Sequence, residues 1–83
     1  MAEVFQGNVL VRDVDGDERP VSKIAVRDAM SRLERFQKDR DPAHGVVEGP
    51  DGELRVKMGG EKGGMKRTVT ASALRAAWAK VRA

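Results

Sequence analysis

The sequence contains no cysteine and no tyrosine, and its aromatic residues are limited to two phenylalanines and one tryptophan. Without cysteine, the chain forms neither a disulfide nor a thiolate metal site. No apolar run is long enough to span a bilayer, and no secretory leader pattern is present. We therefore expect a soluble, cytoplasmic protein with no membrane contact.

The chain also has little material for a core. Its 83 residues allow one small domain, covering positions 1–83. Ten of the apolar residues are alanines and most of the larger ones are valines, so we expect a thin core without a deep enclosed pocket. Arginine outnumbers lysine by 10 to 6. This composition is typical of GC-rich genomes, including their phages and mobile elements.

Residue types that carry catalysis or bind metal are scarce. The single histidine, His44, lies in a connecting loop and has no evident nucleophile or second ligand as a partner. Asp13, Asp15 and Asp17 alternate as ligands of a hard cation do, but Gly16 is misplaced for a calcium-binding loop. We interpret this stretch as an acidic turn. The sequence thus predicts a protein that is not an enzyme and has no metal site or cofactor.

The first half of the chain predicts two strands and a helix. An extended segment at 4–14 is interrupted at Gly7, and after a turn at 15–17 a short strand over 18–21 returns, confined to a sheet edge by Pro20. Ser22 is a suitable N-cap for a helix that ends near Asp39. The apolar stripe of this helix consists of Val26, Ala29, Met30, Leu33 and Phe36.

The second half repeats this order. Residues 46–48 and 53–58 form a predicted hairpin around a turn at 49–52, where proline and glycine favour a tight reversal. A flexible Gly-rich loop at 59–64, a short strand at 65–69 and a helix capped by Thr70 follow. The apolar stripe of that helix consists of Leu74, Ala77, Trp78 and Val81. We therefore predict an α+β fold: a small antiparallel sheet of four to five strands with two helices on one face, in the order β-β-α-β-β-(β)-α.

Charge is divided unevenly along the chain. Residues 1–54 hold 8 Lys or Arg against 12 Asp or Glu, a net of −4, whereas residues 55–83 hold 8 against 1, a net of +7. Such asymmetry favours a polarised surface that attracts phosphates or another acidic partner. The candidate binding residues are the basic ones of the second half: Arg55, Lys57, Lys62, Lys66, Arg67, Arg75, Lys80 and Arg82.

The Gly-rich loop adds a second reason to expect phosphate binding. Glycines allow the backbone to approach a phosphate, and successive N–H groups bind anions. The loop is not a nucleotide-binding P-loop, because Met65 and Lys66 stand where Lys and Ser or Thr are needed. We expect the basic side chains of the loop and of the last helix to lie on one surface and to contact a nucleic-acid backbone.

The stretch from Lys66 to Trp78 resembles the last third of a double-stranded-RNA-binding domain, in which a basic pair begins an Ala-rich helix after a hairpin. The resemblance covers residues 63–78 only. Thr70 stands where that family has a further lysine, and the family's first helix and aromatic-rich strands have no counterpart. The resemblance implies phosphate contacts by Lys66 and Arg67 that depend on the shape of the nucleic acid rather than its sequence.

The alternative is a small protein-interaction module with opposed acidic and basic faces. Phage-borne inhibitors such as anti-CRISPR proteins have this general character: they are short, polar and without motifs. Such a protein acts on a host nucleic-acid-binding protein. The sequence leaves open which partner is bound, and whether the chain acts alone or as a homodimer.

Overall fold

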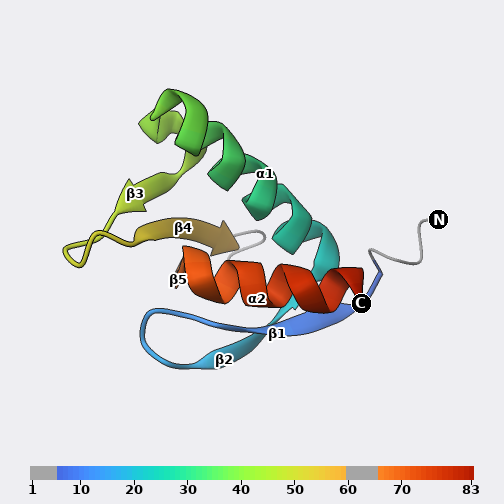
Figure 1. Cartoon of the computed structure of the whole chain (residues 1–83). Coiled ribbons are helices and arrows are strands. Elements are labelled where there is room, and N and C mark those ends of the chain that lie inside the picture. The colour runs from blue at the N-terminus through green and yellow to red at the C-terminus, as the bar shows by residue number, and fades with distance from the viewer. Residues whose placement is uncertain (1–5, 60–65) are drawn as a thin grey trace.

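The computed structural model describes residues 6–59 and 66–83, without the side chains of Lys66 and Arg67. The elements follow the predicted order (Figure 1). The strands are β1 (Asn8–Arg12), β2 (Glu18–Ser22), β3 (Val46–Glu48), β4 (Leu54–Gly59) and β5 (Lys66–Thr70). The helices are α1 (Lys23–Asp39), the short 3-10 helix η2 (Pro42–His44) and α2 (Ala71–Arg82). The α+β class and the predicted order are confirmed.

The strands belong to two antiparallel sheets rather than to the single sheet we predicted. Strands β1 and β2 form a two-stranded ribbon, and β3, β4 and β5 form a three-stranded sheet with β4 in the centre. Among the described residues, one backbone hydrogen bond connects the two sheets, from Val14 N to Thr68 O at 2.9 Å. Val14 lies in the turn after β1, so this bond does not extend into a ladder.

Both helices begin at the predicted caps. Ser22 Oγ accepts a hydrogen bond from Ala25 N at 3.1 Å, and Thr70 Oγ1 accepts one from Ala73 N at 3.2 Å. Each hydroxyl thereby satisfies a backbone donor that has no partner within the helix. Helix α1 ends at Asp39, and its C-cap residue Arg40 has a left-handed backbone (φ 58°) and donates its N–H to the carbonyl of Phe36.

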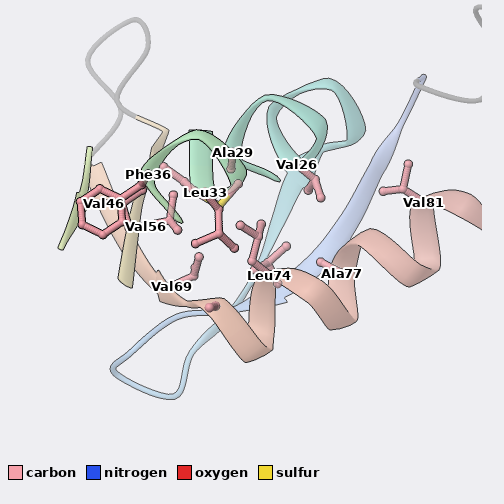
Figure 2. Packing of buried hydrophobic residues seen from close by; sticks show 13 residues of the cluster. Val26, Ala29, Leu33, Phe36, Val46, Val56, Val69, Leu74, Ala77 and Val81 are labelled. Atoms are coloured by element: carbon pink, nitrogen blue, oxygen red, sulfur yellow. The ribbon is translucent and has the colours of Figure 1, made fainter. Parts of the chain in front are cut away.

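The hydrophobic core lies between the helices and one face of the three-stranded sheet (Figure 2). Along β4, Val56 and Met58 are buried whereas Lys57 is exposed, so the helices cover one face and leave the other open. The prediction of two helices on one face is thus confirmed for this sheet. The largest fully buried side chains are Leu33, Leu74, Val26, Val46 and Val56.

Arg32 links α1 to the three-stranded sheet. Its Nη1 donates to the carbonyl of His44 at 3.0 Å, and its Nη2 donates to the carbonyl of Lys57 at 2.9 Å. The first contact needs a glycine beside it: Gly45 has φ 75°, and a Cβ there would lie 2.8 Å from Nη1 of Arg32. The guanidinium therefore fixes the helix against the start of the β3–β4 hairpin.

A second polar contact stabilises the end of α1. His44 Nε2 lies 3.0 Å from both carboxylate oxygens of Asp39. This hydrogen bond, together with one from the backbone N–H of Asp41, holds the pKa of the Asp39 carboxyl below its usual value. In the ranges 6–59 and 66–83, no helix has the length and apolarity required to cross a membrane.

Candidate nucleic-acid interface

Helix α2 presents cations on its outward side. Its buried side chains, Ala71, Leu74, Ala77 and Val81, recur at helical spacing and face the core. The same spacing places Arg75, Lys80 and Arg82 on the exposed surface. Figure 1 shows α2 lying between α1 and the β1–β2 ribbon, and both contact it. The outward face of α2 is thus a well-defined surface held by packing on both sides.

The cations of α2 form no ion pair with the residues that the structure describes. Helix α2 carries three cations and no acid, whereas α1 carries five cations and three acids. No ion pair between described residues involves Arg75, Lys80 or Arg82. The pairs found are Arg12–Glu18, Arg19–Asp17, Arg32–Asp28, His44–Asp39 and Arg55–Asp51. The positive potential of α2 is therefore not cancelled locally.

Arg55 is engaged inside the β3–β4 hairpin. Its guanidinium lies against Gly49, where an added Cβ would collide with Nε, and its Nη2 is 3.4 Å from Asp51 Oδ1. The Arg55 side chain is only 25% exposed. The pKa of the Asp51 carboxyl is lowered by hydrogen bonds from the backbone N–H of Glu53 and from Arg55. Arg55 thus stabilises the turn and offers little surface to a ligand.

Lys57 lies on a different surface from α2. It is exposed on the face of β4 that points away from both helices, and its partner across the ladder is Thr68. Because α2 packs on the opposite face of the same sheet, Lys57 and the α2 cations do not share one surface. The described residues therefore do not form the continuous patch we expected from the sequence.

The remaining predicted residues lie outside the described part in whole or in part. The predicted flexible loop at 59–64, with Lys62, falls there except for Gly59, which ends β4. The backbone of β5 pairs Lys66 with Gly59 and Arg67 with Met58, while the side chains of Lys66 and Arg67 are not among those described.

The N-terminus of α2 already has an anionic neighbour. The hydroxyl of Ser72, in the first turn of the helix, donates to Glu53 Oε2 at 2.5 Å. A carboxylate at this end is favourable because the helix dipole is positive there. A phosphate would be repelled by Glu53, so the attractive part of α2 is the part beyond its first turn, where Arg75, Lys80 and Arg82 lie.

A shallow hollow of about 220 Å³ separates α2 from the β1–β2 ribbon. Its apolar part includes Leu10, a residue that is 51% exposed, and three alanines of α2. Its charged rim combines the Arg12–Glu18 pair with Lys80. The complete lining is Leu10, Arg12, Glu18, Ala73, Ala76, Ala77 and Lys80. Sequence reasoning did not find this hollow, because it depends on how the ribbon packs on the helix.

The described residues include no cluster of three or more His, Cys, Asp or Glu side chains suited to a metal ion. The acidic turn instead satisfies its own backbone, with Asp13 Oδ1 accepting from the N–H groups of Asp15 and Asp17 at 3.0 Å. Comparison with known proteins adds no family assignment: no protein-family model, curated protein or solved structure matches this chain.

Proposed function

We propose that this protein is a non-enzymatic, cytoplasmic nucleic-acid-binding module that contacts the phosphate backbone through α2. One observation supports this proposal above the others: three exposed cations occupy a helix that has no acid, and none of them has an ion-pair partner among the described residues. The binding residues are Arg75, Lys80 and Arg82.

The expected energetics follow from counterion release. Each phosphate neutralised by Lys or Arg lowers the slope of log K against log salt by about 0.9 for a B-form duplex. Three contacts therefore give a slope of about −2.7 and a loss of roughly 40-fold in affinity between about 50 and 200 mM salt. A protein interface built on an apolar anchor would depend far less on salt.

The test compares two variants with the same change in net charge. In the α2 variant, Arg75, Lys80 and Arg82 are replaced by Gln, which retains helix propensity. In the control variant, Gln replaces three exposed cations elsewhere, none of which has an ion pair among the described residues: Arg35, Lys38 and Lys57. Binding to labelled oligonucleotides is measured by fluorescence anisotropy over a salt series, and circular dichroism checks folding.

The α2 variant is expected to bind at least about tenfold more weakly and to lose most of the salt slope, whereas the control stays close to the unmodified protein. Equal losses in both variants would show that net charge, rather than the α2 surface, attracts nucleic acid. If the unmodified protein binds no oligonucleotide even at low salt, the proposal fails.

A second candidate function is a protein-interaction module, such as a phage-borne inhibitor of a host nucleic-acid-binding protein. The observation that favours it is the hollow beside α2, where the half-exposed Leu10 could anchor a partner's apolar side chain. The test is capture from a nuclease-treated host lysate with the unmodified protein and with Leu10→Gln. A partner lost with Leu10→Gln, together with no oligonucleotide binding, would support this function in place of the first.

A further inference from the structure

The aromatic side chains of the described residues are directed into the core. Phe36 is 7% exposed, and Trp78 is half-buried and packs against the core. Proteins that bind single-stranded nucleic acid without sequence preference usually stack bases on exposed aromatic rings. The surface of α2 offers cations without such rings. This combination favours a ligand whose bases are already stacked on each other, which is a duplex.

The cations of α2 lie along two flanks of its outward face. Arg75 and Arg82 share one flank and are seven residues apart, which corresponds to about 10.5 Å along the helix axis. Lys80 lies on the other flank, about 140° around the axis from Arg75. The exposed positions between the flanks hold the small residues Ser72, Ala76 and Ala79. The outward face thus has only small side chains along its centre and positive charges along both edges.

We propose that the nucleic acid recognised by this protein is a B-form DNA duplex, with the part of α2 from Arg75 to Arg82 in its major groove; the inference rests on the function proposed above. The major groove of B-DNA is about 12 Å wide and admits an α-helix, whereas that of A-form RNA is too narrow for side chains to read. Charge complementarity favours a duplex as the ligand, because the cations on the two flanks of α2 can contact the phosphates of both strands.

The surroundings of α2 define how far the contact extends. Glu53 at the N-terminal end keeps phosphates away from the first turn. On the Lys80 flank, the neighbouring Arg12 is paired with Glu18 at 3.4 Å, so Lys80 supplies the net positive charge there. The contact therefore extends from Arg75 to the end of α2, and it places Ala76 and Ala79 closest to the base edges.

The experiment measures binding of the unmodified protein to three labelled oligonucleotides of equal length: a DNA duplex, an RNA duplex and a single DNA strand. The DNA duplex is expected to bind at least about tenfold more tightly than either of the others. A variant carrying Ala76→Leu and Ala79→Leu keeps every cation but adds bulk at the centre of the face. This variant is expected to bind the DNA duplex with about tenfold lower affinity and to bind the single strand with unchanged affinity. Ala43→Leu, at an exposed alanine of η2, is the matched control for added bulk.

The outcomes separate this inference from the function on which it rests. If no oligonucleotide is bound, both fail, and an acidic protein becomes the expected partner of α2. If the RNA duplex or the single strand binds as well as the DNA duplex, the proposed function stands and the inference is overturned. If the double leucine variant folds normally and binds the DNA duplex like the unmodified protein, α2 does not enter the groove.

Discussion

Replacing Arg32 with Met tests whether one guanidinium holds α1 to the three-stranded sheet. The substitution keeps the aliphatic stem and removes the two hydrogen bonds to the carbonyls of His44 and Lys57, at 3.0 and 2.9 Å. Hydrogen bonds from charged groups contribute about 1.5–3 kcal/mol each when buried. The Arg32 side chain is 27% exposed, so water competes for the same hydrogen-bonding groups. We therefore expect each of these hydrogen bonds to contribute about 1–1.5 kcal/mol to stability.

The expected loss in free energy of unfolding is therefore about 2–3 kcal/mol. The ion pair of Arg32 with Asp28 adds little, because an exposed pair four residues apart contributes only about 0.3–0.5 kcal/mol. A domain of this length has a total stability of roughly 4–12 kcal/mol, so the loss is large. It corresponds to a fall in Tm of roughly 10–20 °C.

The assay is urea unfolding followed by circular dichroism and by the fluorescence of Trp78, which packs against the core. The matched control is Arg35→Met on the same helix. Arg35 is exposed and makes no hydrogen bond or ion pair with the described residues, so its replacement is expected to change stability by less than about 0.5 kcal/mol. Equal effects of the two substitutions would refute the role given to Arg32.

Three further predictions concern the fold. Gly45→Ala should destabilise the protein by about 1–3 kcal/mol in urea titrations, because it combines a positive φ with a close approach to Arg32; no change would contradict this geometry. Leu74→Ala should cost about 2–5 kcal/mol, measured the same way, since Leu74 is fully buried; a loss under about 1 kcal/mol would place it outside the core. The pKa values of Asp39 and Asp51 are lowered in the folded state, so their contribution to stability is present above the ordinary carboxyl pKa and is lost as the pH falls through the lowered values. The urea midpoint should therefore fall on acidification, and less so when both are replaced by Asn; equal slopes would argue against this linkage.

The elements of the fold were predictable because their signals are local. A hydroxyl at Ser22 or Thr70 caps a helix through a donor three residues away, and an apolar stripe reflects the period of the helix itself. The division into two sheets was not predictable. It depends on whether Val14 and Thr68, which are distant in the sequence, extend one hydrogen bond into a ladder.

The candidate interface was likewise predictable only where its signals are local. Helical spacing alone places Arg75 and Arg82 on one flank of the last helix and Lys80 on the other, and all three are exposed. The separation of Lys57 from these cations arises because side chains alternate along β4, so the face of the strand away from the core is also the face away from α2. The carbonyl contacts of Arg32 span 12 and 25 residues, and no local pattern indicates them.

Among the described residues, one backbone hydrogen bond joins the ribbon to the three-stranded sheet, and this has a consequence for fluctuations within the native state. Opening the ribbon would break that bond, the packing of β1 on α2 and the contacts of β2 with α1, while the ladders of β3, β4 and β5 would stay intact. Amide protons of β1 and β2 should then exchange with solvent through a partial unfolding that costs less than unfolding the whole chain. In the partly open form, the flank of α2 that bears Lys80 loses its neighbour, so the accessibility of this helix is coupled to the stability of the ribbon.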